Sequence, residues 1–209
     1  MKKLIITQRI VEHESYSETR DCIDVRWSQV CSSLKVFPIF MPSNYDVTLY
    51  IEEIKPDGII LSGGNDLYSF SGNKLSNKRD QIEKITLDIA VQRNIPVLGI
   101  CRGMQLITEY FGGKLIKATG HVGVEHSLKI NTSSRFAEEL NSLEIVNSYH
   151  NYCVEKVPDE FIPSAWSDEG YSEAMEHKNK NIFAQMWHPE REKEFKTQDL
   201  QMMKKLFDL

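Results

Sequence analysis

The chain has 209 residues and a formal net charge of −5 at pH 7, from 25 basic and 30 acidic side chains. Hydrophobic residues make up 41% and charged residues 26%, a globular composition that excludes intrinsic disorder for most of the chain. The acidic balance argues against a nucleic-acid polymer as partner. We expect a single domain over residues 1–209, since this length lies within the usual size range of one domain.

The sequence also disfavours membrane insertion and a disulfide framework. No stretch approaches the ~20 apolar residues that a spanning helix needs, and the apolar run at 4–6 is too short for a secretory signal. The four cysteines, Cys22, Cys31, Cys101 and Cys153, form no CxxC pair. We therefore expect reduced thiols, a cytoplasmic location and no membrane partner.

Short apolar runs recur along the chain and predict β-strands. They lie at 4–6, 36–40, 58–61, 96–100, 144–146 and 182–187. Helical spacing of apolar residues predicts helices at 21–34, 80–93 and 103–111, and a charged helix is expected at 197–209. This alternation predicts an α/β fold with a mostly parallel sheet flanked by helices. We expect hairpins or a mixed sheet within 114–186, and a polar surface loop at 69–77 that is a candidate lid.

The segment 95–105 runs from an apolar strand directly into a helix, with Cys101 at the junction between Gly99 and Gly103. A strained strand-to-helix turn with small flanking residues is typical of a nucleophile elbow. Unpaired N–H groups at a helix N-terminus favour the thiolate. A buried structural cysteine is the alternative, but the paired glycines favour Cys101 as a nucleophile.

A thiolate nucleophile needs a base and a group that orients the base. The apolar strand at 182–187 leads to His188, Pro189 ends the strand, and Glu190 follows. We predict a catalytic triad of Cys101, His188 and Glu190. The alternative is a histidine that merely ends a strand beside a solvated glutamate.

Acyl chemistry also needs hydrogen-bond donors for an oxyanion. The strand at 58–61 ends in Ser62, Gly63 and Gly64, whose N–H groups would lie at the carboxyl end of the sheet. A simple turn is the alternative for the glycine pair. The N–H of Arg102, directly after the nucleophile, is the second candidate donor.

We expect no cofactor and no metal. His121 and His126 could pair around a metal ion, but no carboxylate or cysteine stands near them at ligand spacing. His13 and His177 have neighbours typical of a solvated surface.

These segments together resemble the class I glutamine amidotransferase-like family. Residues 99–105 match its nucleophile motif, 188–190 its histidine–glutamate motif and 62–64 its oxyanion strand, in the expected order. The γ-glutamyl hydrolase branch matches best, on 79–83 and 146–150. The resemblance implies a flavodoxin-like open sheet and cysteine-dependent hydrolysis of a γ-glutamyl amide in a small molecule, which releases glutamate and an amine or phosphoramidate.

The resemblance also implies roles for individual residues. Gly64 and Arg102 would supply the oxyanion N–H groups. Gln105, with the backbone around Tyr149 and His150, would hold the glutamyl α-amino and α-carboxylate groups. Ser69 stands where the branch commonly has proline and Asn151 where it often has glutamine, so the leaving-group side is expected to be unusual.

Three arginines near the amino end, Arg9, Arg20 and Arg26, could bind a phosphate, because the guanidinium fork matches phosphate oxygens. A solvated loop and helix face is the alternative. At its narrowest, the resemblance implies a γ-glutamyl-CDP-amidate as the substrate and the release of cytidine diphosphoramidate for capsule polysaccharide modification. Arg9 and Arg26 would then be substrate-binding residues.

Two other functions stay open. A glutaminase subunit would pass ammonia to a separate synthetase. A non-catalytic binding module on the same scaffold is disfavoured by the complete triad. A homodimer is also open.

Overall fold

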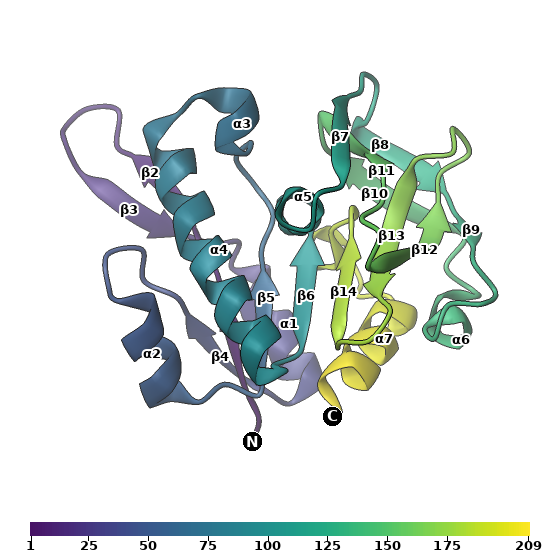
Figure 1. The fold of residues 1–209 in the computed structure, drawn as a ribbon, viewed down its shortest axis with the longest axis horizontal. Coiled ribbons are helices and arrows are strands. Elements are labelled where there is room, and N and C mark those ends of the chain that lie inside the picture. Colours follow the sequence, from purple (N-terminus) through teal and green to yellow (C-terminus); the bar gives the residue numbers. More distant parts are fainter.

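The structure is a computed structural model that describes residues 1–209. Its centre is a ten-stranded sheet with the main strand order β4-β1-β5-β6-β14-β13-β11-β7 (Figure 1). The parallel strands are β1 (Lys3–Ile6), β4 (Phe37–Phe40), β5 (Gly58–Leu61), β6 (Val97–Ile100) and β14 (Ile182–Gln185). Numbered along the chain, these strands lie in the order 2-1-3-4-5, which is the flavodoxin-like order. The predicted α/β fold is confirmed.

The central strands are buried on both faces, which explains why they read as continuous apolar runs. All four residues of β5, β6 and β14 are buried. Their register places Ile60 beside Leu98 and Phe183 beside the same Leu98. The carboxyl ends of these strands therefore meet at one edge of the sheet, where open α/β sheets bind ligands.

The second half of the chain supplies the antiparallel part, as expected (Figure 1). Antiparallel strands extend the sheet beyond β14: β7 (Lys114–Lys117), β9 (Lys129–Ile130), β11 (Tyr152–Lys156), β12 (Phe161–Trp166) and β13 (Ser172–His177). Next to them, β8 (Val122–Ser127) and β10 (Ile145–Tyr149) form a separate antiparallel pair.

Helices cover both faces of the parallel strands (Figure 1). One face carries α2 (Val47–Ile54), α4 (Lys74–Arg93) and α5 (Arg102–Tyr110). The other carries α1 (Arg26–Leu34) and α7 (Thr197–Phe207), with the short α6 (Ala137–Leu140) against α7. None of the helices combines the length and the hydropathy that a membrane span requires.

Two local predictions are wrong. The helix expected over 21–34 begins only at Arg26, because the preceding residues form a hairpin of β2 (Arg9–Glu12) and β3 (Thr19–Cys22). The loop expected over 69–77 is helical, since α3 (Tyr68–Ser71) precedes α4. Asn73 caps α4 by accepting the Leu75 N–H at 2.7 Å, and the Phe70 ring stacks on Tyr152 with centroids 3.8 Å apart.

Candidate active site

Cys101 occupies a strained turn between β6 and α5. Its φ of 50° and ψ of −100° lie outside the regions that a residue with a side chain prefers. The Cys101 N–H donates to the Gln185 carbonyl at 2.7 Å, and the Cys101 carbonyl accepts the Gln105 N–H at 3.0 Å. A Cβ atom at Gly103 would lie 2.2 Å from the Leu61 carbonyl oxygen, so only glycine allows α5 this close to β5. This is the geometry of a nucleophile elbow.

His188 follows the end of β14 and is 1% exposed. Its Nδ1 lies 2.7 Å from Oε1 of Glu190, which belongs to the single 3₁₀ turn Pro189–Arg191. Its buried Nε2 has no hydrogen-bond partner and is the nitrogen left for the Cys101 thiol. Burial disfavours the imidazolium, but Cys101 and the Glu190 carboxylate outweigh burial and raise the pKa of His188 to about 9.

The loop after β5 packs against His188. Gly64 has a φ of +86°, and a Cβ atom at Gly63 would lie 2.5 Å from Cε1 of His188. The Arg79 guanidinium donates to the carbonyls of Ser62 and Gly64, each at 2.6 Å. These bonds engage carbonyl groups of the loop, and an oxyanion hole in this loop would use its N–H groups.

Arg79 and Arg102 belong to one buried network of ion pairs. The Glu83 carboxylate accepts from Arg79 at 2.9 Å, from Thr7 at 2.7 Å and from Arg102. Arg102 also pairs with Asp80. Burial alone would raise the pKa of Glu83, but the two guanidinium groups outweigh burial and hold it below its usual value. The Arg102 side chain therefore anchors α5, while its N–H, the first of the helix, has no intrahelical acceptor.

The predicted nucleophile and base lie at a pocket of about 230 Å³. Cys101 and His188 line it together with the predicted residues Gly64, Arg102, Gln105, Tyr149 and His150. The Gln105 amide donates to the Tyr152 carbonyl at 3.1 Å. The fold thus brings five of the seven predicted oxyanion and substrate residues to one pocket beside the nucleophile.

The other two predicted substrate residues, Arg9 and Arg26, do not line this pocket. The Arg26 guanidinium donates to the carbonyls of Glu192 and Lys193 and lies 4.9 Å from the Phe195 ring centroid. Arg26 is thus engaged by its own chain outside this pocket, and substrate binding by Arg26 stays a prediction. Arg9 packs against the loop after β5, since a Cβ atom at Gly64 would lie 2.1 Å from Nε of Arg9.

One arginine of the pocket, Arg191, is not among the residues predicted from the sequence. Arg191 lines the pocket, and its guanidinium lies 4.5 Å from the Tyr149 ring centroid. The available signal was its position directly after Glu190. Arg20, in contrast, pairs with Glu18 on the exposed β2–β3 hairpin.

The fold places the other histidines differently from what their neighbours in the sequence indicate. His121 and His126 do have further candidate ligands, because the fold brings His150 and Glu173 next to them. These four residues are called the histidine cluster below. Burial and neighbouring histidines lower the pKa of His150 to about 3, so its imidazole is neutral. His177, expected at the surface, is buried in β13.

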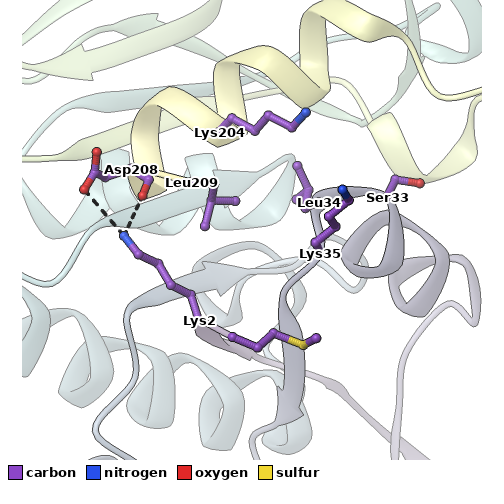
Figure 2. Close-up of a pocket in the computed structure, with 8 residues that line it drawn as sticks. Lys2, Ser33, Leu34, Lys35, Lys204, Asp208 and Leu209 are labelled. Carbon is purple, nitrogen blue, oxygen red and sulfur yellow. Dashed lines mark hydrogen bonds and ion pairs between the residues drawn. The ribbon is translucent and has the colours of Figure 1, made fainter.

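A larger hollow of about 530 Å³ lies at the opposite, amino end of the parallel strands. Figure 2 shows Lys2, Lys35 and Lys204 around it, with the Lys2 ammonium bonded to Asp208. It contains none of the predicted site residues. The active-site pocket is therefore assigned by its chemistry rather than by its size.

The fold is a class I glutamine amidotransferase fold, and the relatives and the family model below define a hydrolase acting on an amide bond. The Peptidase C26 family model matches residues 5–190, and the chain belongs to this family.

Relatives agree with this assignment. A gamma-glutamyl-CDP-amidate hydrolase of Campylobacter jejuni is 35% identical over 206 residues, which cover 98% of this chain and 96% of that protein. The glutamine amidotransferase-like protein YvdE of Lactococcus lactis is 33% identical over 64% of this chain and 66% of its own length. A GMP synthase of Bacillus pumilus is 35% identical over 68% of this chain, but the match covers only 26% of that protein.

Solved structures show the same fold. A Thermoplasma acidophilum protein described as a GMP synthase subunit superposes with a TM-score of 0.75 at 22% identity, over 100% of this chain and 93% of that one. A glutamine amidotransferase of Thermotoga maritima gives a TM-score of 0.66 at 11% identity, over 90% and 76% of the two chains.

Proposed function

We propose that this protein hydrolyses the γ-glutamyl amide bond of a small molecule and releases glutamate. The observation that carries the proposal is the placement of Cys101 on a strained elbow, in one pocket with a His188 imidazole that Glu190 orients at 2.7 Å. Membership of the Peptidase C26 family supports the same reaction.

In the first half of the reaction, the Cys101 sulfur attacks the γ-carbonyl carbon, and the carbonyl oxygen becomes an oxyanion held by the N–H groups of Gly64 and Arg102. When the tetrahedral intermediate collapses, the C–N bond breaks and His188 gives its proton to the leaving nitrogen. The products are a γ-glutamyl thioester on Cys101 and the free amine or amidate. A pKa of about 9 keeps His188 protonated for this step at neutral pH.

In the second half, the now neutral His188 takes a proton from water while the water oxygen attacks the thioester carbon. The C–S bond breaks, glutamate leaves, and the proton held by His188 restores the starting pair with Cys101. Glu190 holds Nδ1 throughout, so Nε2 is the nitrogen that exchanges the proton. Gln105 and the backbone at Tyr149 and His150 hold the α-amino and α-carboxylate groups of the glutamyl part.

For the leaving group, we infer a phosphorylated amidate of the γ-glutamyl-CDP-amidate type, formed for capsule polysaccharide modification. Two observations support this narrower substrate. The relative in Campylobacter jejuni carries that substrate in its name and matches nearly the whole chain. In addition, Arg191 sits half-exposed in the pocket lining, where a guanidinium can bind phosphate oxygens.

The experiment is a screen of the purified protein for glutamate release from γ-glutamyl-CDP-amidate, γ-glutamyl-p-nitroanilide, γ-glutamyl-γ-aminobutyrate and glutamine. We expect kcat/KM for the best γ-glutamyl conjugate to exceed that for glutamine by at least about tenfold. Turnover of glutamine alone would contradict the hydrolase and favour the ammonia-supplying subunit. Turnover of other conjugates but not of the nucleotide would contradict only the narrower substrate. Cys101→Ala is the control and should remove every activity.

The homodimer and the cytoplasmic location stay predictions of the sequence. Gel filtration with light scattering tests the first, and fractionation of the producing cells tests the second.

A further inference from the structure

The histidine cluster lies where three strands of the antiparallel region meet. His126 belongs to β8 and His121 directly precedes it, while His150 follows β10 and Glu173 belongs to β13. The fold holds them together through the backbone, since the His150 N–H donates to the His121 carbonyl at 3.0 Å. In the β8–β10 pair, His126 stands opposite Val146.

Four polar atoms of this cluster are buried without any hydrogen-bond partner. They are His121 Nδ1, His126 Nε2, His150 Nε2 and Glu173 Oε1. The residues His121, His150 and Glu173 are each at most 3% exposed. A buried polar atom left unpaired costs free energy of folding, and four such atoms in adjacent residues call for a common partner.

The geometry points to a metal ion as that partner: we propose that the histidine cluster binds one Zn²⁺ ion. One ligand atom from each of the four residues lies within 4.8 Å of all the others. Three imidazoles and one carboxylate are ligand types that zinc prefers, in the number that a closed tetrahedral site needs. A tetrahedral zinc separates its ligands by about 3.4 Å, so the side chains would close inward by about an ångström.

The surrounding groups orient the imidazoles as metal ligands are usually oriented. Nε2 of His121 lies 3.1 Å from a Glu169 carboxylate oxygen, which leaves Nδ1 with its lone pair. Nδ1 of His150 lies 3.7 Å from the Cys153 sulfur, which can accept a hydrogen bond from Nδ1–H and so leave the Nε2 lone pair free. Carboxylate–histidine–zinc arrangements of the first kind are common in zinc proteins.

The ion would stabilise the wall of the active-site pocket. His150 belongs both to the cluster and to the pocket lining, between Tyr149 and Asn151. Binding would cross-link the turn after β10 to β13 and would thereby hold these pocket residues in place. With four protein ligands the site is closed, so its role is structural and separate from the chemistry at Cys101.

The experiment measures zinc by plasma mass spectrometry in protein produced without a histidine tag and freed of loose metal by gel filtration. We expect about one zinc per chain in the wild type and less than about 0.2 in Glu173→Gln and in His126→Ala. Cys101→Ser and His13→Ala are the matched controls and should keep the ion. Retention in Cys101→Ser separates the cluster from adventitious binding at the nucleophile, and no substrate is needed, so this result is independent of the proposed reaction.

Two further measurements keep the test decisive if one variant does not fold. Stripped wild-type protein titrated with Co²⁺ should develop the visible absorption of a tetrahedral site, which Zn²⁺ abolishes and Mg²⁺ does not. Zinc at about a hundredfold its dissociation constant should raise Tm by roughly 5–10 °C. Less than about half a zinc per chain without a Co²⁺ signal, or zinc unchanged in both cluster variants, would overturn the proposal.

Discussion

The side-chain amide of Asn147 holds His188 by both of its backbone polar groups. Oδ1 of Asn147 accepts the His188 N–H at 2.9 Å, and Nδ2 donates to the His188 carbonyl at 2.9 Å. The same Nδ2 also donates to the Glu192 carboxylate at 2.7 Å. Asn147 lies in β10 and His188 just beyond β14, so this contact joins the antiparallel region to the proposed catalytic base.

Replacing Asn147 by alanine should therefore move the base without removing it. We expect Asn147→Ala to lower kcat by roughly 10- to 100-fold, because small displacements of a catalytic group cost about this much. The measurement is steady-state hydrolysis of the best γ-glutamyl amide. The pH at which kcat/KM falls on the alkaline side is the second readout. Glu144→Ala, an exposed change just before the same strand, is the control. Equal activity of the two variants would refute the positioning role.

The four cysteines should differ in reactivity. Burial raises the pKa of Cys31 to about 11 and that of Cys153 to about 12, so both should resist alkylation at pH 7.5. Cys101 should react with iodoacetamide ahead of the half-exposed Cys22, as peptide mapping of a labelling time course would show. Faster labelling of Cys22 would argue against an activated nucleophile.

The pH dependence should report the raised pKa of His188. The first chemical step uses the imidazolium, so kcat/KM should fall as pH rises through about 9. Glu190→Gln removes a carboxylate that favours the charged ring, so the alkaline limit should move to lower pH and kcat should fall roughly 10²- to 10⁴-fold. Profiles between pH 6 and 10 check both. A limit that stays in place, or rises, in Glu190→Gln would contradict this role of Glu190.

The buried ion network should matter for stability far more than surface ion pairs do. Glu83→Gln removes the buried negative charge that pairs with the guanidinium groups of Arg79 and Arg102. This change should lower the free energy of unfolding by about 3–5 kcal/mol. The matched control is Glu52→Gln, which breaks the exposed pair with Arg93 and should cost less than about 1 kcal/mol. Urea unfolding curves measure both, and similar losses would exclude a special contribution of the network.

Arg191 should act on the anionic leaving group. We expect Arg191→Gln to raise KM for γ-glutamyl-CDP-amidate by about tenfold and KM for γ-glutamyl-p-nitroanilide by less than about twofold, because only the first carries phosphate. Arg20→Gln, on the exposed hairpin, should leave both unchanged. Equal increases for the two substrates would instead place Arg191 at the glutamyl end.

The turn at Cys101 and the contact between His188 and Glu190 rest on local sequence signals. The elbow needs a strand, Cys101 and glycines within a few residues, and Glu190 can reach His188 because a single turn joins them. The polar composition of 69–77 is typical of a loop, but Asn73 caps the start of a helix there. Its side chain accepts the Leu75 N–H, which has no backbone acceptor in the first turn of the helix.

The buried parallel strands, the turn at Cys101 and the contact between His188 and Glu190 could all be predicted from short stretches of sequence, because buried strands and tight turns restrict residue type locally. Only the tertiary structure decided which distant charges meet. It paired Glu83 with Arg102, turned Arg26 to the Glu192 carbonyl, and placed Arg191 in the pocket. It also brought His150 and Glu173 next to His121 and His126. Such contacts depend on strand order and register, which no short stretch of sequence specifies.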